Sequence, residues 1–322
     1  MAMFRGQRIV RMIMEKEEAD MMLMSDDRKL WYSIDASMVS KELSERFHQF
    51  HFDEETQHFL DNSFNTSNAV CLQFYYIVVS AFLSMFLSKT SVNGLLGRGG
   101  MFIFSTEQFR NFMQIPHDWI SADKKMIDLG AGDGGVTSVM EKFYSQVYVT
   151  EASQVMKLRL RQRGYTVYPI EAWNTKGPFD LISALNLLDR HYDPDILLSE
   201  LYAAASNGNG FVLLAIVLPV RQYVEFHPDK QSTTADSLIP VEGETFEEQA
   251  DWLVNYYFAP AGFRLIRWGK LPYLCEGDHM RAYYKLDDAV FLLQAVNGTD
   301  TSCNTCSAAA RKCPQPSSRI IY

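Results

Sequence analysis

The sequence predicts an α/β fold, in which a parallel doubly wound sheet follows a mainly helical N-terminal extension. Downstream of residue 125, short apolar segments alternate with segments of helical length and periodicity. The apolar segments are continuous runs, as expected for strands that helices cover on both faces of a sheet. Upstream of residue 120, the chain instead shows helix-start signals and one long apolar run.

The order of the expected elements can be read along the chain. Strands are expected at 125–130, 146–151, 166–172, 179–187 and 210–219, with helices at 134–144, 153–164 and 194–206 between them. A further helix at 246–262 begins at a capping box of Thr245 and Glu248 and ends at Gly262. Two last strands, at 263–273 and 287–296, are expected to add an antiparallel edge.

Composition divides the chain into four segments. Residues 1–40 form a variable polar N-terminal segment, 41–120 a helical extension that packs on the sheet domain, and 121–296 the sheet domain itself. Residues 297–322 are rich in Ser, Thr, Pro and Ala, which predicts a disordered tail. Within the extension, Ser105 and Gln108 predict a second capping box at the start of a short helix.

A run of 19 residues from Ala69 to Leu87 contains no charged side chain. It is nearly long enough to span a bilayer. Gln73 and the tyrosine and serine positions near its middle favour a different interpretation, a helix buried beneath the α/β domain. Association with a membrane stays open as the alternative.

The overall charge limits the classes of partner. The chain carries a net charge of −9 and has a pI near 5.3, so nucleic acid is not expected as the main partner.

Cys303 and Cys306 form a C-x-x-C pair in the tail without the second pair that a zinc site needs, and no metal site is expected.

A glycine-rich loop follows the first expected strand and allows two interpretations. Gly130, Gly132 and Gly135 have the spacing of a dinucleotide-binding turn. Gly130, Gly132 and Gly134, preceded by Asp128, equally fit the first loop of an S-adenosylmethionine enzyme. The first interpretation implies hydride transfer and the second implies methyl transfer.

The charges around the loop favour methyl transfer. Asp128 and Asp133 would each repel a pyrophosphate by roughly 1 to 4 kcal/mol, depending on the local dielectric. The sulfonium and ammonium groups of S-adenosylmethionine would instead be attracted. Glu151 ends the next strand, where an acceptor for two ribose hydroxyls is expected with either cofactor.

Three further segments carry a resemblance to a known family. They are LLGRG at 95–99, LNLLDR at 185–190 and LPYLCEGD at 271–278. With the glycine loop, they resemble the methyltransferase-like nine family, also called DREV, of protein-histidine N-pros-methyltransferases. The resemblance covers roughly residues 45–296 and implies a class I, Rossmann-like, S-adenosylmethionine-dependent methyltransferase.

The resemblance also implies a substrate. It is the pros nitrogen of histidine in H-x-H motifs of substrate proteins, where x is small, and a small-molecule imidazole remains the alternative. A monomer is expected. The resemblance implies a location in the endoplasmic reticulum or the mitochondrion, whereas the lack of an apolar signal-like start would favour the cytoplasm.

The LNLLDR segment provides the expected catalytic groups. We expect Asp189 to accept the tele N–H of the substrate histidine, and Asn186 to hold the methionine end of the cofactor or the substrate ring. The alternative is that Asp189 only pairs locally with Arg190. Arg190 is itself a candidate for substrate binding.

Aromatic and basic residues complete the expected site. By resemblance, Tyr273 lies at the cofactor and Tyr284 at the substrate ring, and Tyr283 is a further candidate for substrate contact. Trp173 is a candidate neighbour of the adenine. Arg98, within NGLLGRGG, could lie along the substrate peptide or over the cofactor carboxylate, although the glycines around it are also typical of a helix end.

Overall fold

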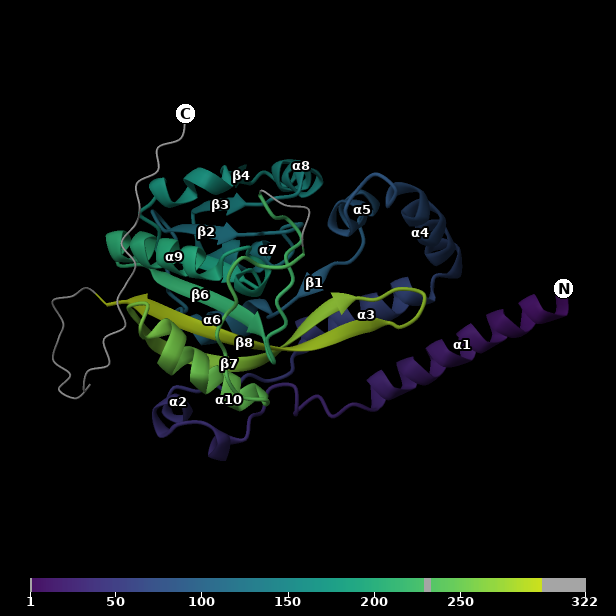
Figure 1. Cartoon of the computed structure of the whole chain (residues 1–322), viewed down its shortest axis with the longest axis horizontal. Helices are drawn as coiled ribbons and strands as arrows, with labels where there is room; N and C mark the ends of the chain where they lie inside the picture. Colours follow the sequence, from purple (N-terminus) through teal and green to yellow (C-terminus); the bar gives the residue numbers. More distant parts are fainter. Residues whose placement is uncertain (1, 229–232, 297–322) are drawn as a thin grey trace.

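The computed structural model describes the backbone of residues 2–228 and 233–296, and the side chains of this range from residue 13 onward together with Arg11. Within it, eight strands form one sheet with helices on both faces (Figure 1). The predicted disordered tail and its cysteines lie outside the described residues.

The sheet is parallel in one half and antiparallel in the other. Its order is β1 (Met101–Phe102), β7 (Phe263–Glu276), β8 (Tyr283–Ala295), β6 (Phe211–Val217), β5 (Leu181–Leu185), β2 (Lys125–Leu129), β3 (Gln146–Thr150) and β4 (Thr166–Val167). The strands from β2 to β6 run parallel, and β8, β7 and β1 add an antiparallel edge. This is the predicted α/β fold, and its strand order is that of class I methyltransferases.

One predicted strand is much shorter than expected. The segment 166–172 forms only β4, and residues Ile170–Thr175 continue as the 3-10 helix η3. Pro169 lies between the two elements and has no N–H group to donate to a ladder, so the strand cannot continue through it.

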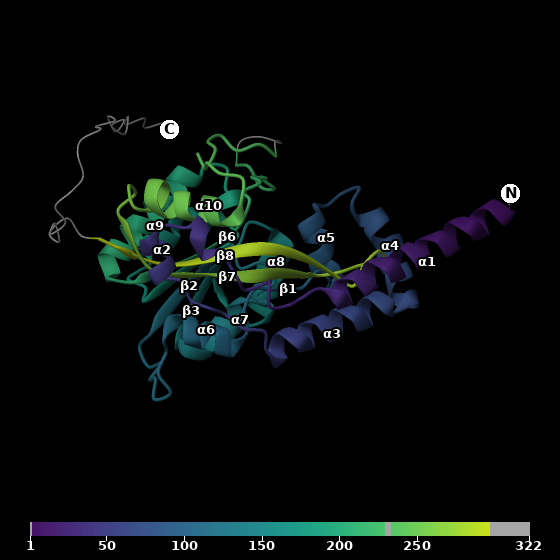
Figure 2. The ribbon, with the colours of Figure 1, turned by 90° about the horizontal axis from the view of Figure 1, so that it is seen from below.

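Helices cover the two faces of the sheet. In Figure 2, α9 (Pro194–Gly208) and α10 (Phe246–Trp252) lie on one side, and α6 (Thr106–Met113) and α7 (Thr137–Met140) on the other. α8 (Gln154–Gln162) follows β3. The predicted helix at 246–262 is instead α10 continued by a π-helical turn, η5 (Leu253–Phe258).

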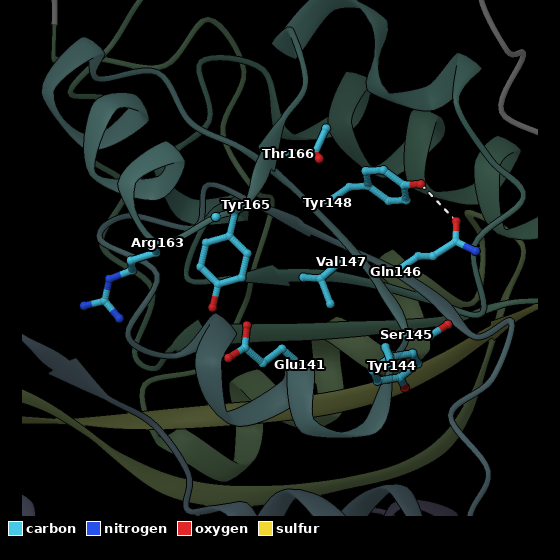
Figure 3. Close-up of a pocket in the computed structure, with 10 residues that line it drawn as sticks. Glu141, Tyr144, Ser145, Gln146, Val147, Tyr148, Arg163, Tyr165 and Thr166 are labelled. Carbon is cyan, nitrogen blue, oxygen red and sulfur yellow. Dashed lines mark hydrogen bonds between the residues drawn. The ribbon is translucent and has the colours of Figure 1, made fainter.

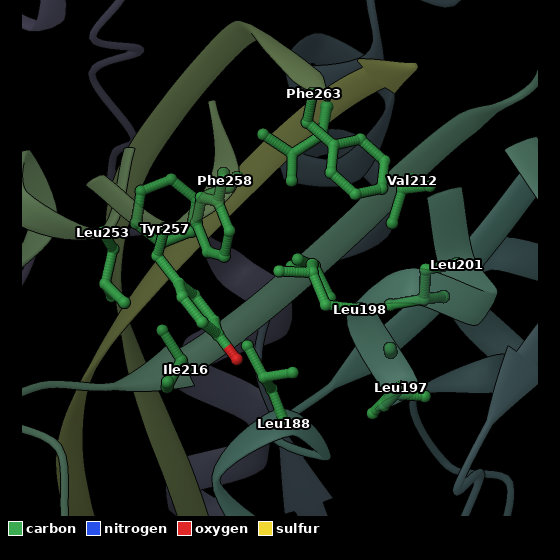
Figure 4. Close-up of a cluster of buried hydrophobic side chains, with 14 of the residues drawn as sticks. Leu188, Leu197, Leu198, Leu201, Val212, Ile216, Leu253, Tyr257, Phe258 and Phe263 are labelled. Carbon is green, nitrogen blue, oxygen red and sulfur yellow. The ribbon is translucent and has the colours of Figure 1, made fainter. Parts of the chain in front are cut away.

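Apolar residues from both the helices and the sheet form the core on the α9 side (Figure 4). Leu197 and Leu201 of α9 belong to this cluster together with Val212 of β6. In the same cluster, Phe258 packs on Phe291 with ring centroids 5.3 Å apart. These positions come from the continuous apolar runs, which explains why the sequence pattern predicted this half of the fold.

Both predicted capping boxes are present. Ser105 Oγ accepts the Gln108 N–H while Gln108 Oε1 accepts the Ser105 N–H, and this box is buried at the start of α6. Thr245 and Glu248 make the same pair of bonds at the start of α10. Each box satisfies two of the N–H groups that a helix start leaves free.

The extension is mainly helical. It contains α1 (Ala2–Ser25), η1 (Ala36–Met38), α2 (Lys41–Glu45), α3 (Glu54–Asn68), α4 (Val70–Leu83) and α5 (Lys89–Leu96). It also adds β1 to the sheet, and Phe47 forms a bridge with Trp268 of β7. The segment expected to be polar up to residue 40 includes Trp31 and Tyr32, which are almost fully buried in the second core cluster.

The prediction for the apolar run is wrong. The run forms α4 and the turn after it, and only Gln73 and Tyr76 of that helix are buried. Its large apolar residues are mostly exposed, because only one face of α4 contacts the rest of the protein. Among the described residues, no single helix is long and apolar enough to cross a membrane, whereas α3 and α4, bent by 76°, pass that test together.

Candidate active site

The glycine loop turns the chain at the carboxyl end of β2. Gly130, Gly132 and Gly134 have φ values of +71°, +57° and +81°, a region that other residues adopt only with strain. A side chain on Gly130 would meet Leu187, and one on Gly132 would touch Met101. The loop therefore needs glycine both for its backbone and for close approach.

Asp128 anchors this loop from below. Its two carboxylate oxygens accept hydrogen bonds from the hydroxyls of Ser183 (2.7 Å) and Thr137 (2.6 Å). These bonds connect β2 to β5 and to α7. Burial raises the pKa of Asp128 to about 6, against the opposing effect of the two hydroxyl donors. Asp133 is turned within the loop, where it accepts the Gly135 N–H and lies 3.8 Å from Arg163.

Glu151 joins the loop to the end of the next strand. Its Oε2 accepts the Gly132 N–H (2.9 Å) and its Oε1 accepts the Ser153 N–H (2.8 Å). The side chain is buried, and burial raises its pKa. A carboxylate is thus held beside the glycine loop at the carboxyl edge of the sheet, where ligands of open α/β sheets bind.

Asn186 lies just beyond β5 at the same edge. Its φ is +52°, an uncommon value for a residue with a side chain. Its Nδ2 donates to Asp288 Oδ2 over 2.9 Å, and Asp288 is fully buried in β8, opposite Val217 at the end of β6. The bond therefore links the end of β5 to the antiparallel half of the sheet.

Asp189 follows in the short helix η4 (Leu188–Arg190) and is only 1% exposed. The Nε of Arg190 is 3.3 Å from its Oδ2. Burial raises the pKa of Asp189 despite this cation, and burial also raises that of Asp288 well above its usual range, with the Asp189 charge adding to the effect.

Three buried oxygens in this corner have no hydrogen-bond partner among the described residues. They are Oδ1 of Asn186, Oδ1 of Asp189 and Oδ1 of Asp288. Buried acceptors are nearly always bonded in native proteins. The corner is therefore built to receive hydrogen-bond donors or positive charge from a bound molecule.

Tyr273 and Tyr284 belong to the same face of the β7–β8 hairpin as Asp288. Tyr273 pairs with Leu286, Tyr284 with Cys275, and directly paired residues project to one side of an antiparallel sheet. The hydroxyl of Tyr273 lies 2.5 Å from Sδ of Met101, and burial raises its pKa well above the usual value. Tyr284 is 38% exposed, and its hydroxyl donates to Asp278.

Two candidates do not reach this corner. Tyr283 is on the opposite face of the hairpin, buried, with its hydroxyl donating to the Leu23 carbonyl. Trp173 is buried in the core cluster that contains α9. The expected contacts of Tyr283 with substrate and of Trp173 with adenine do not fit these placements, because neither ring has a free face at the site.

The basic candidates also differ from one another. Arg98 stacks over Tyr76, with its guanidinium 5.2 Å from the ring centroid, just after α5 ends at Gly97. The N–H groups of Gly99 and Gly100 donate to Glu276 rather than to an open site. Arg190 is half-exposed, and its Nε lies 3.3 Å from Asp189 Oδ2. This is the local pair expected from the sequence as the alternative role of Asp189.

Asp288 was not identified from the sequence as a residue of the site. The available signal was a second acidic residue at the start of the otherwise apolar segment 288–293, where a buried strand rarely carries a charge. Its partner Asn186 is 102 residues away in the chain, so only the fold brings them together.

A separate cavity of about 440 Å³ lies near the opposite edge of the sheet (Figure 3). It is lined by residues at the starts of β3 and β4, including Gln146 and Thr166, with Tyr148 donating to Gln146. Asp128 lies near the carboxyl end of β2, and Glu151 and Asn186 directly follow β3 and β5, so this cavity at the starts of the strands is not part of the site described above.

Comparison with known proteins identifies the family. The sequence profile of the DREV methyltransferase family matches residues 31–295. Among solved structures, an S-adenosylmethionine-dependent methyltransferase from Clostridium acetobutylicum ATCC 824 is 12% identical, with a TM-score of 0.38 over 70% of this chain and 100% of that chain. Magnesium protoporphyrin IX methyltransferase from Synechocystis PCC 6803 is also 12% identical, with a TM-score of 0.38 over 74% and 100% of the two chains.

These structural likenesses are remote, and the identification depends on the family profile together with the strand order. The family profile agrees with the cofactor expected from the glycine loop, which is S-adenosylmethionine. The chain belongs to the DREV methyltransferase family and is an S-adenosylmethionine-dependent methyltransferase.

Proposed function

We propose that this enzyme methylates the pros nitrogen of histidine in H-x-H motifs of substrate proteins, where x is small. The observation that carries the proposal is the pair of buried carboxyls, Asp189 and Asp288, each with an oxygen that lacks a donor. A neutral imidazole brings one N–H donor, which such an acceptor can bind, and its nitrogen lone pair on the other side of the ring is left free for the methyl group.

The cofactor fits the neighbouring loops. The glycine loop permits close approach, Glu151 supplies a carboxylate for the ribose hydroxyls, and the unpartnered Oδ1 of Asn186 suits a cationic methionine end. When bound, the cofactor supplies a methyl group on a positively charged sulfur. Tyr273, which faces the same corner, is the expected aromatic neighbour of the cofactor.

Asp189 then acts on the substrate ring. By accepting the tele N–H, its carboxylate would hold the tautomer whose lone pair is on the pros nitrogen and would direct that lone pair toward the methyl group. Transfer of the methyl group from sulfur to the pros nitrogen would break the S–C bond and leave the ring as an imidazolium. The two carboxylates would stabilise this cation until its tele proton is released to water. Their raised pKa values reflect the cost of burying negative charge, a cost that the positive ring offsets.

Tyr284 and Arg190 are expected to contact the substrate peptide. Both are at least partly exposed beside the corner, and the peptide could lie extended across the carboxyl edge of the sheet. Alternate side chains of an extended peptide point the same way, so both histidines of H-x-H would enter together. The residue between them would face the opposite way, against a wall that limits its size.

The resemblance supports two further parts of the proposal. We expect a monomeric enzyme in the endoplasmic reticulum or the mitochondrion, with the cytoplasm as the alternative. Fractionation of cells that produce the tagged full chain tests the location.

The experiment that tests the chemistry uses short peptides. Purified enzyme with labelled S-adenosylmethionine should methylate an Ala-His-Ala-His peptide, with the label on the pros nitrogen after hydrolysis. Replacement of the non-reacting histidine by alanine should remove most of the activity, and leucine between the histidines should nearly abolish it. A product at the tele nitrogen contradicts the proposal, and equal turnover of free histidine supports a small-molecule methyltransferase instead.

A further inference from the structure

An apolar ridge runs along α4 and the turn that follows it. It is defined by the exposed side chains of Val70, Phe74, Ile77, Val78, Phe82 and Phe86. Phe74 and Phe86 are 68% and 73% exposed, values unusual for phenylalanine. Monomeric soluble proteins rarely present a contiguous apolar surface of this kind without a partner.

The exposed apolar surface extends around more than half of the helix. At about 100° per residue, the ridge residues of α4 cover about 140°, and the exposed side chains of Leu72 and Tyr75 widen the arc to about 220°. Only the side of Gln73 and Tyr76 faces the protein. A groove on a partner protein would cover one stripe of such a helix, whereas a fluid apolar phase can cover the whole arc.

Several polar side chains of the run are turned away from the ridge or bonded within it. Gln73 is buried and donates to the Thr66 carbonyl, and Ser84 donates to the Ser80 carbonyl one turn earlier. Tyr76 is buried beneath the Arg98 guanidinium. Hydrocarbon favours such placements, because it offers no hydrogen-bond partner to an exposed polar group. Tyr75 is the exception, 53% exposed beside the ridge, and tyrosine is suited to the boundary where an apolar phase meets water.

The ends of the run are polar. The chain has no charged residue from Ala69 to Leu87, and an exposed lysine, Lys89, follows directly at the start of α5. Helix α4 lies away from α9 and α10 in both Figure 1 and Figure 2, on the side of the molecule where α1 extends past it. Such a helix can therefore approach a flat surface without a clash from the catalytic half.

We propose that the ridge inserts into the apolar boundary of a lipid bilayer and holds the enzyme at a membrane surface. The driving force is burial of apolar side chains, so the net charge of −9 does not prevent binding to uncharged lipid. The proposal does not depend on histidine as the substrate.

The ridge is also connected to the active site. After α4, helix α5 packs on α8, where Ser91 Oγ lies 3.1 Å from Ser153 Oγ. Ser153 in turn donates its N–H to Glu151. A membrane bound at α4 would therefore lie one helix away from the carboxylate expected to hold the cofactor.

Sedimentation with vesicles of pure phosphatidylcholine tests the proposal. The purified full chain should pellet with the vesicles and stay in solution without them. The double variant Phe74→Glu/Phe82→Glu should reduce the partition coefficient roughly tenfold or more, because it removes apolar burial from the centre of the ridge. Phe86→Glu, beyond the end of α4, should also reduce the partition coefficient. This variant provides the test if the double variant does not fold.

Ile120→Glu is the matched control. Ile120 is 75% exposed outside the ridge, and the variant adds one negative charge, as Phe86→Glu does. It should pellet like the wild type. The proposal is wrong if the wild type does not pellet, if Ile120→Glu loses binding equally, or if size-exclusion chromatography shows a dimer that the ridge variants dissociate without lipid.

Discussion

Asp189 and Asp288 put two carboxyls into one buried corner, and each has an oxygen without a donor. Their surroundings differ in a way that separates their roles. Asp189 lies beside the half-exposed Arg190, whereas Asp288 is fully buried and accepts from Asn186. We therefore expect Asp189 to contact the substrate ring and Asp288 to position Asn186.

Replacement of each residue by asparagine tests this division. Asp189→Asn should lower kcat by roughly a hundredfold or more, because the amide cannot stabilise the imidazolium, while cofactor affinity stays near the wild-type value. Asp288→Asn should weaken cofactor binding instead, because the new buried NH2 group replaces an acceptor oxygen beside Asn186 and would change the orientation in which Asn186 is held. Single-turnover rates and calorimetric cofactor titrations measure the two effects.

Asp287→Asn provides the control for both variants. Asp287 is adjacent in β8 but faces Lys270 and Lys285, away from the corner. It should retain activity and cofactor affinity. A wild-type rate in Asp189→Asn would remove that residue from the catalytic step.

Asp128 gives a prediction about pH. Its folded-state pKa is about 6, above the ordinary value of 3.8, so the folded protein binds this proton more tightly than the unfolded chain. Stability contributed by the protonated form is present below pH 4 and is lost as the pH rises to about 6. The loss is on the order of 3 kcal/mol.

The variant Asp128→Asn should lack this pH dependence. Urea unfolding of both cofactor-free proteins at pH 4 and pH 7 measures it. The free energy of unfolding of the wild type, relative to the variant, should fall over this interval by an amount of that order. Parallel pH profiles would show that the carboxyl does not titrate as expected.

At the scale of elements, the two capping boxes have the same hydrogen bonds in different environments. The box at Ser105 is buried, and the box at Thr245 is exposed. Loss of a cap in a buried place also leaves an N–H group without water, which adds a desolvation cost. From the sequence alone, the two capping boxes could not be distinguished.

Ser105→Ala should therefore destabilise the protein more than Thr245→Ala. We expect about 1 to 2 kcal/mol for the first and about 0.5 to 1 kcal/mol for the second. The shift of the urea midpoint at a constant m-value measures each. Equal losses would mean that burial adds nothing to this motif.

At the scale of the whole molecule, Trp31 joins the extension to the sheet. Its ring meets Tyr283 of β8 edge-on, with centroids 6.3 Å apart, and Phe52 in the same way at 6.2 Å. Its Nε1 donates to Asp26. The extension is therefore expected to unfold together with the methyltransferase domain.

Trp31→Ala should reduce the free energy of unfolding by about 3 to 5 kcal/mol, because it leaves a large cavity at this junction. Calorimetry should still show one transition, at a lower temperature. Leu30→Ala is the neighbouring control: Leu30 is exposed, and its loss should change stability by no more than about 0.5 kcal/mol. Two separate transitions in the wild type would contradict the expected coupling.

The sequence by itself determined the α/β class, the succession of strands and helices along most of the sheet domain, and the nature of the cofactor loop. These features depend on local information: continuous apolar runs mark strands buried on both faces, and glycines mark positive φ. The charges of Asp128 and Asp133 were equally local evidence, which is why S-adenosylmethionine could be chosen over a dinucleotide from the sequence alone.

The tertiary structure decided which side chains share the active-site corner and which do not. Asp288 reaches Asn186 only because β8 inserts beside β6, and Tyr283 faces away because side chains alternate along a strand. The fold also decided that α4 exposes its apolar side chains. An apolar run is compatible with a buried helix and with a membrane-facing one, and only packing against the rest of the chain distinguishes them.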